Sequence, residues 1–271
     1  MRAPSDRELC FTMSVVDERE LVHDRVRRIR RVYPRSTVVL LLDGDVREKS
    51  WPSGDGIVTR RTGGALYALG GRGRVVHAHL EAFLESGARW WFKVDPDTVV
   101  RRPLKALPDE RSFFGTLQGG EPAPSLQGGC IGGTREAVVE LVTSGVLLAP
   151  ELADVAGTWG RGNPNVLARA RRGVTSFDFV HAWACREVRI PLRTHPEIRS
   201  EWKEPPLDAE RYAITHPHKS LDEVAEREKL RDRRLVSRGV LALIDDAVPP
   251  GARVAVVSKG DERLTALRRH T

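Results

Sequence analysis

The fold class follows from two apolar stretches, Glu8-Leu-Cys-Phe-Thr-Met-Ser-Val-Val16 and Ser36-Thr-Val-Val-Leu-Leu-Leu-Asp43. Each is short and almost wholly apolar, which predicts a buried strand. Residues 18–33 lie between them and place apolar side chains at helical spacing, until Pro34 ends the helix. Two β-α units in succession predict an α/β fold with a mostly parallel central sheet.

The chain has 271 residues, 40% of them hydrophobic, which suffices for one large domain or for one domain plus a small second unit. Its unbroken apolar runs, of which Val38–Leu42 is one, are far shorter than the roughly 18 to 20 residues of a membrane helix. Residues 1–20 carry acids instead of the apolar core of a signal peptide. We therefore expect neither a membrane span nor secretion through a signal peptide.

The cysteines and the charges restrict the cellular setting. Cys10, Cys130 and Cys185 stand far apart without a C-x-x-C pair, so we expect reduced cysteines in a cytoplasmic protein. The net charge of +7 is spread over short clusters such as Arg27–Arg31, without a nucleic-acid-binding motif, so no nucleic-acid partner is expected. Such a cluster is either solvated surface or a contact for an anionic ligand, because guanidinium groups suit phosphates.

A turn-rich segment spans residues 50–73 and precedes a helix expected at 74–86. Its glycines do not have the spacing of a dinucleotide-binding loop. A loop that opens a helix can nevertheless present backbone N–H groups to a phosphate, with Arg72 or Arg74 adding positive charge. A loop with no ligand is the alternative.

Two carboxylates follow the short apolar strand expected at residues 89–94, in the sequence Asp95-Pro96-Asp97. Open α/β sheets bind ligands at the carboxyl ends of their strands, and Pro96 stiffens the backbone there. Two carboxylates held this close repel each other, so a divalent cation such as Mg²⁺ or Mn²⁺ would stabilise the pair. The alternative is a strand-end turn in which Asp97 caps the next segment.

Residues 125–134 form a glycine-rich strand or turn, and a helix is expected after it at 135–143. Gly128 and Gly129 would allow a ligand to approach the backbone closely, and a bulged strand is the alternative. Asp178 lies in the first turn of a helix expected to run to about Val188. Its carboxylate either does chemistry or only complements the helix dipole.

A late strand ends in His216-Pro-His218-Lys219. Two imidazoles and an ammonium group can supply a neutral metal ligand and a phosphate contact. Histidines of a surface loop are the alternative. The stretch before it contains Pro191, Pro196, Pro205 and Pro206 and is expected to be irregular.

The order and spacing of Val94–Asp97, Gln127–Gly133, Phe177–Val180 and His216–His218 resemble those of GT-A-fold glycosyltransferases, and the Fringe-like group in particular. The resemblance covers about residues 8–219. It implies a metal-dependent hexosyltransferase that moves a sugar, with inversion, from a nucleotide-diphosphate donor to an acceptor hydroxyl. A UDP-sugar is the favoured donor, and the acceptor is a saccharide, small molecule or peptide.

The resemblance also implies roles for individual residues. Asp97, with Asp95 and one of the two histidines, His216 or His218, would hold Mn²⁺ or Mg²⁺ against the donor diphosphate. Asp178 would be the general base that deprotonates the acceptor. The sequence departs from the family at Pro96, where an acid is usual, and at Phe177, where a glutamate usually precedes the base. The donor itself would be contacted by Asp17, Asp43, Arg72, Arg74, Asp95, Gln127, Gly128, Gly129 and Lys219.

Two other functions fit parts of the sequence. A haloacid dehalogenase-like phosphatase would use Asp95 as nucleophile and Asp97 as acid/base, with Asp245-Asp246 as its late acidic pair. That family usually begins its fold with the nucleophile strand, whereas two β-α units come first here. A non-catalytic module that binds sugar nucleotides is the third possibility.

The C-terminal part has a different pattern. Residues 220–246 predict one or two charged helices, residues 253–260 a strand, and Asp261 begins a last helix. The resemblance implies a GT-A domain at 1–219. Because one β-α unit cannot bury itself, the strand at 253–260 either adds to the main sheet or begins a second α/β domain, and we expect the second arrangement. Residues 220–271 would then form a helical linker and the start of a second, incomplete α/β unit, as in the front part of a longer protein.

Overall fold

The computed structural model divides the chain into two compact units, Met1–His218 and Lys219–Thr271. It describes residues 2–15, 19–42, 51–62, 73–118, 124–148, 177–200, 211–216 and 248–249. The helices and the strand expected within 220–271 therefore lie outside the described residues, and the domain boundary at 219/220 stays a prediction. All the elements below belong to the first unit.

A seven-stranded sheet forms the centre of this unit, in the order β3-β2-β1-β4-β7-β6-β8. The pairs β3-β2, β2-β1, β1-β4 and β6-β8 are parallel, and β7 runs antiparallel to both of its neighbours. The expected α/β fold with a mostly parallel sheet is confirmed, and it is compatible with a Rossmann-like arrangement. The strands are β1 (Leu9–Val15), β2 (Thr37–Leu42), β3 (Ile57–Arg61), β4 (Trp90–Val94), β6 (Phe113–Gln118), β7 (Ser125–Thr134) and β8 (Leu192–Thr194).

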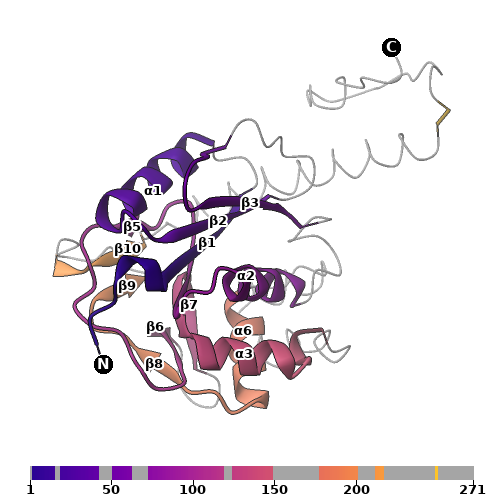
Figure 1. Cartoon of the computed structure of the whole chain (residues 1–271). Helices are drawn as coiled ribbons and strands as arrows, with labels where there is room; N and C mark the ends of the chain where they lie inside the picture. Colours follow the sequence, from indigo (N-terminus) through magenta and orange to yellow (C-terminus); the bar gives the residue numbers. More distant parts are fainter. Residues whose placement is uncertain are drawn as a thin grey trace, which may run out of the picture. The chain divides into compact units, whose positions relative to one another are not determined.

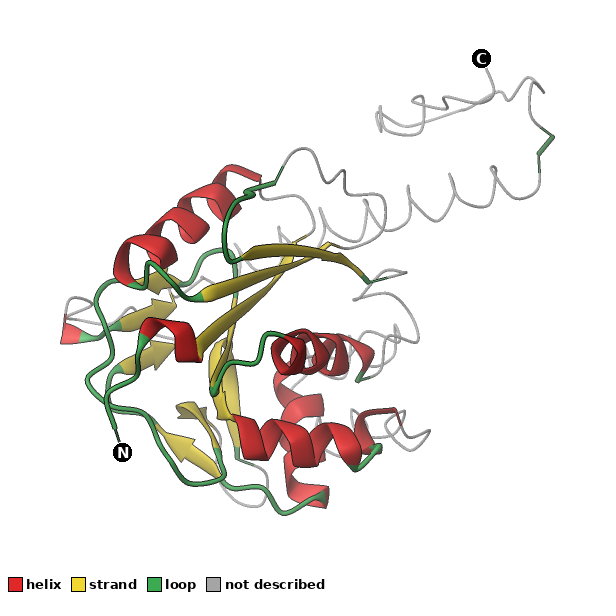
Figure 2. Ribbon diagram, viewed as in Figure 1, coloured by secondary structure: helices red, strands yellow, loops and turns green. Residues whose placement is uncertain are grey.

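Helices cover both faces of the sheet (Figures 1 and 2), and the sheet separates two apolar cores. On one side, α1 buries Val22, Val26 and Ile29. Three helices cover the other side. One follows β3, one follows β7, and one follows a segment outside the described residues. This layering leaves all seven residues of β1 buried, as the continuous apolar run predicts. The helices are α1 (Arg19–Val32), α2 (Arg74–Glu85), α3 (Arg135–Thr143) and α6 (Phe177–Glu187), with short 3₁₀ turns η1 (Asp6–Glu8) and η3 (Val146–Leu148).

A second, three-stranded sheet lies on the same side as α1 (Figure 1). Its central strand β10 (Ile214–His216) pairs antiparallel with β5 (Val99–Val100) and parallel with β9 (Ile198–Ser200). Since β5 begins two residues after Asp97, this pairing brings the end of β10 to the turn that follows β4.

Two segments differ from the expectation. The turn-rich segment 50–73 contains β3, and the stretch expected to be irregular contains β8 and β9. β3 is an edge strand without a buried face, and Val58 in it is 45% exposed, so it carries no alternating apolar pattern. β8 and β9 have three residues each, which is too short for a periodic pattern.

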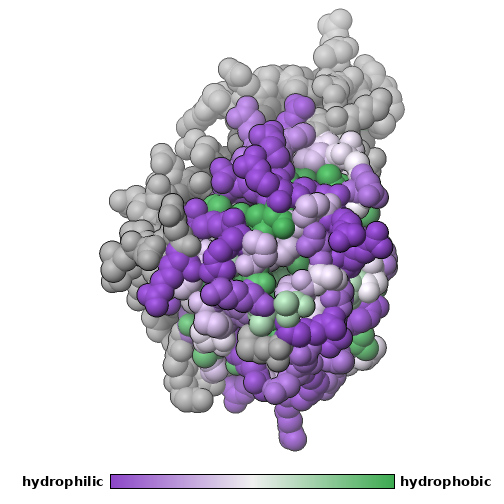
Figure 3. Space-filling model, turned by 60° about the vertical axis from the view of Figure 1, so that its left-hand side comes forward, coloured by the Kyte–Doolittle hydropathy of each residue, from purple (hydrophilic) through white to green (hydrophobic). Residues whose placement is uncertain are grey.

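Hydrophilic residues cover most of the coloured surface in Figure 3, which brings the left-hand side of Figure 1 forward. In α1, the side chains of Arg19, Arg27, Arg28 and Arg31 are exposed. Among the described residues, no helix is both long enough and apolar enough to cross a membrane.

Candidate metal centre

The turn Asp95–Thr98 follows the buried strand β4 and is held from several directions. Asp95 N donates to Thr98 Oγ1 (3.1 Å), and Thr98 Oγ1 donates to the carbonyl of Gly129 (2.5 Å). On the α1 side, Arg25 Nε donates to Pro96 O (2.8 Å). These bonds fix the backbone that carries both carboxylates, so their positions are set by β4, β7 and α1 together.

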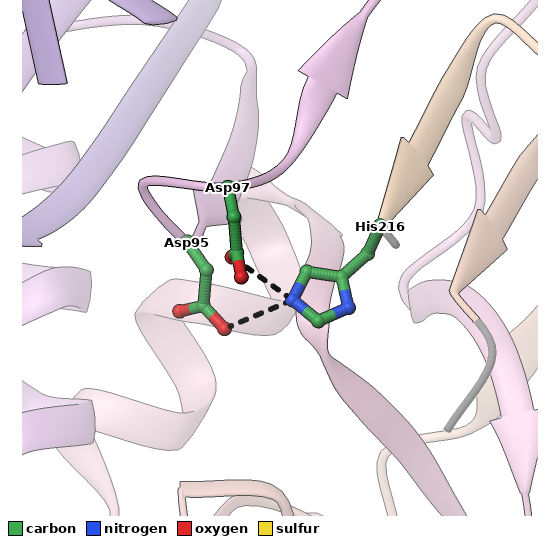
Figure 4. A group of neighbouring side chains, drawn as sticks. All are labelled: Asp95, Asp97 and His216. Carbon is green, nitrogen blue, oxygen red and sulfur yellow. Dashed lines mark hydrogen bonds and ion pairs between the residues drawn. The ribbon is translucent and has the colours of Figure 1, made fainter. Parts of the chain in front are cut away.

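Asp95, Asp97 and His216 come together at the end of β4 (Figure 4). His216 Nε2 lies 3.1 Å from Asp97 Oδ1 and 3.6 Å from Asp95 Oδ2. One ligand atom from each residue lies within 4.8 Å of the other two, so the group could hold a metal ion. The Asp97 and His216 side chains are buried, whereas Asp95 is partly exposed.

Two glycines of β7 make room for the side chains of this site. A Cβ atom on Gly129 would lie 2.2 Å from the His216 ring, and one on Gly128 would lie 1.9 Å from Asp178 Oδ1. Successive residues of a strand point to opposite faces. Gly128 therefore admits Asp178 on the face covered by α6, and Gly129 admits His216 on the face of the small sheet.

Asp178 lies in the first turn of α6, as the sequence predicts. Gln118 Nε2 donates to its Oδ2 (3.4 Å). Burial raises the pKa of the Asp178 carboxyl above its usual value, while the Lys93 ammonium and a hydrogen bond from the Gly128 backbone act in the opposite direction. The group is thus a carboxylate with raised basicity beside a positive charge, which is a combination found in general bases.

Lys93 is the site residue that sequence reasoning missed. Its side chain is buried within β4, where Nζ donates to Asp95 Oδ1 (2.5 Å) and to the Gly128 carbonyl oxygen. The ammonium also lies 5.0 Å from the centre of the Phe177 ring. A buried charge needs such partners. The signal in the sequence was the single charged residue among the apolar side chains of β4.

The structure places the other expected residues as follows. Gln127 is buried, and its Oε1 accepts a hydrogen bond from Gly129 N (2.7 Å), so this side chain braces β7 itself. Arg74 is exposed as the first residue of α2, after Gly73. Asp17, Asp43, Arg72, His218 and Lys219 lie outside the described residues.

The cysteines do not form a site in the described part of the chain. Cys10, Cys130 and Cys185 are free and buried, and burial raises the pKa of the first two thiols to about 12. His181 lies one helical turn before Cys185, and burial lowers the pKa of its imidazole to about 3. This ring packs nearly perpendicular to the Phe113 ring, at 4.5 Å between centres, which is a core contact.

The sequence was compared with models of protein families and with curated proteins. No family model matches it, and no curated protein is similar to it at a significant level. The function is therefore inferred from the geometry of the site.

Proposed function

We propose that this protein is a metal-dependent glycosyltransferase of the GT-A type, related to the Fringe-like group. It would move a hexosyl group from a UDP-sugar to an acceptor hydroxyl, with inversion at the anomeric carbon. The observation that carries the proposal is the Asp95-Asp97-His216 group, which adjoins Gly129 while Asp178 contacts the neighbouring Gly128. A candidate metal centre and a candidate base thus share one strand.

The three side chains suit Mn²⁺ or Mg²⁺. Asp97 Oδ1, Asp95 Oδ2 and His216 Nε2 would be the ligand atoms, because these atoms face one another. Carboxylate oxygens suit both ions, and the imidazole nitrogen favours Mn²⁺. When bound, the ion would offset the negative charge that develops on the nucleoside diphosphate leaving group.

Asp178 would accept the proton of the acceptor hydroxyl. Gln118 and Gly128 orient its carboxylate, and its raised pKa makes it a stronger base than an exposed aspartate. Lys93 donates a hydrogen bond to Asp95, and its positive charge lowers the pKa of Asp178 against the effect of burial, which favours the ionised form of the base. Proton removal by Asp178 as the diphosphate departs toward the ion would make the reaction a single in-line displacement.

The phosphatase alternative would use Asp95 and Asp97 without a histidine. It assigns no role to His216, whose Nε2 faces both carboxylates, nor to Gly129, which makes space for that ring. Its late pair, Asp245 and Asp246, lies outside the described residues. The transferase proposal gives a role to the two carboxylates, to His216 and to Gly129, which is why we prefer it.

The test is calorimetric titration of UDP, and then of GDP, into the purified protein with and without Mn²⁺. We expect Mn²⁺-dependent binding of UDP that is lost in Asp97→Ala. Asp109→Ala is the matched control, because Asp109 pairs with Arg89 next to the opposite end of β4. If wild-type protein bound neither nucleotide with any divalent ion, the proposal would be wrong.

A further inference from the structure

Two buried polar atoms lie next to the candidate metal centre without a partner. Within the described ranges, neither Ser200 Oγ nor His216 Nδ1 has a hydrogen-bond partner, and each residue is only 2% exposed. A buried polar atom without a partner is costly and uncommon. The burial of these two atoms without a hydrogen bond therefore needs a physical explanation.

The pairing of β9 with β10 brings the two side chains together. The strands run parallel, with Ser200 opposite His216 and Ile198 opposite Ile214. Side chains two residues apart share a face of a strand, and both isoleucines lie in the same apolar core. Ser200 and His216 therefore share that face as neighbours across two strands, about 5 Å apart at the backbone.

The backbone of Ser200 is fixed by the central sheet. Its N–H donates to Thr116 Oγ1 (2.7 Å), and Thr116 Oγ1 donates to Ile198 O (3.1 Å). β9 is thus tied to β6 on one side and to β10 on the other. The freedom that remains to Ser200 is rotation of its short side chain between staggered positions.

Metal binding specifies the tautomer of His216. Nε2 is the atom that faces Asp97 Oδ1 and Asp95 Oδ2, so Nε2 must offer its lone pair to an ion. The proton of the neutral ring then resides on Nδ1, which becomes a buried donor. The nearby carbonyl of Gly129 already accepts hydrogen bonds from Asp95 N and Thr98 Oγ1.

We propose that Ser200 is a positioning residue of the metal centre, whose hydroxyl accepts a hydrogen bond from His216 Nδ1–H. This bond fixes the tautomer that leaves Nε2 available to the ion. Histidine ligands in metalloproteins are oriented by such a second hydrogen bond. The inference rests on the proposed metal centre, but it makes a separate prediction about Ser200.

The test compares Ser200→Ala with Ser200→Thr by titration of Mn²⁺ and by thermal melting of the metal-free protein. We expect the alanine variant to bind Mn²⁺ about 10- to 100-fold more weakly. Its metal-free melting temperature should stay the same or rise, because the hydroxyl has no hydrogen-bond partner among the described residues. Threonine keeps the hydroxyl and should restore the affinity.

Ser112→Ala is the matched control. Ser112 is also buried, but its hydroxyl donates to Glu110 O (3.0 Å) and its backbone N–H is bonded at the far end of β7, to Thr134 Oγ1. This variant should melt earlier and bind Mn²⁺ as tightly as wild type. Nitrogen-15 spectra of the imidazoles provide a second readout: at a Mg²⁺ concentration that saturates wild type but not the variant, wild type should show protonated Nδ1 at His216 and Ser200→Ala should not.

Unchanged Mn²⁺ affinity in Ser200→Ala would overturn the inference and leave the metal centre intact. A loss of affinity that comes with a lower metal-free melting temperature, and that threonine does not restore, would indicate a merely structural role and would also overturn it. Wild-type protein that binds no divalent ion would overturn both the inference and the metal centre.

Discussion

β7 contains two glycine pairs that make room for different kinds of side chain. Gly128-Gly129 lies in the part of β7 next to the carboxyl end of β4, and Gly132-Gly133 lies further along the strand. All four glycines are buried, and a Cβ atom on any of them would be 2.6 Å or less from a neighbouring side chain. The first pair makes room for Asp178 and His216, which are polar side chains of the candidate site.

The second pair makes room for aromatic rings of the core. A Cβ atom on Gly132 would lie 2.2 Å from the Phe114 ring, and one on Gly133 would lie 2.6 Å from the Phe113 ring. Substitution of the first pair should therefore change chemistry, and substitution of the second should change stability. A glycine pair in a strand thus indicates that another side chain lies close to the backbone. Whether the pair serves the candidate site or the core depends on which side chain that is.

Gly129→Ala should have the largest effect. Its methyl group would displace the buried His216 ring and so remove the imidazole from the two carboxylates. We expect Mn²⁺ affinity to fall about 100-fold or more, with activity lost as a consequence. Titration of Mn²⁺ measures the first, and transfer from a UDP-sugar measures the second. Wild-type affinity in this variant would contradict the placement of His216 in the site.

Gly128→Ala should affect turnover and leave the ion in place. The new methyl group would push away the Asp178 carboxylate, and a positioned general base contributes about 100- to 10,000-fold to a rate. We expect kcat to fall about 100-fold, with Mn²⁺ affinity equal to that of wild type. Steady-state kinetics at saturating donor provide the measurement. A variant that lost metal affinity and kept kcat would show that the two glycines have been assigned the wrong way round.

Lys93→Met removes the charge that acts on both halves of the site while keeping an unbranched side chain. The Lys93 ammonium lowers the pKa of Asp178, so that pKa should rise without it. A base is active when ionised, and the acid limb of the kcat/KM profile should therefore move to higher pH. The pH profile of the purified variant tests this shift. A limb that stayed in place would exclude Lys93 as a partner of the base.

Gly132→Ala should have the smallest effect on the reaction. Here the methyl group meets the Phe114 ring, and overpacking of a core costs about 1 to 3 kcal/mol of unfolding free energy. We expect urea unfolding at a lower midpoint, with Mn²⁺ affinity and kcat unchanged below that midpoint. A change in metal affinity here, as large as in Gly129→Ala, would remove the distinction between the two pairs.

The sequence predicted those parts of the fold that have continuous or periodic apolar patterns. β1 and β2 were found in this way because they bury most of their side chains, and α1 because it buries one apolar face at helical spacing. β3 was missed because an edge strand does not need an apolar face, and β9 because its three residues show no pattern. Strands of this kind are specified by their partners in the sheet, which the sequence does not show.

The candidate site was predictable where it consists of neighbours along the chain. Asp95 and Asp97 could be paired from the sequence, and the resemblance added His216 and Asp178. The contacts of Lys93 and Ser200 could not be predicted, because they depend on the register of β4 with β7 and of β9 with β10. Long-range register, rather than residue type, decides which polar group meets which.

The small sheet joins two parts of the chain that are far apart in the sequence. Asp97 and His216 are 119 residues apart in sequence, and an ion between them would tie β5 and β10 together as a reversible cross-link. An ion at 100 times its dissociation constant stabilises the folded state by about 2.7 kcal/mol. Chelation would therefore lower the melting temperature and speed proteolysis, and the supply of the metal would help to set how long the folded protein survives.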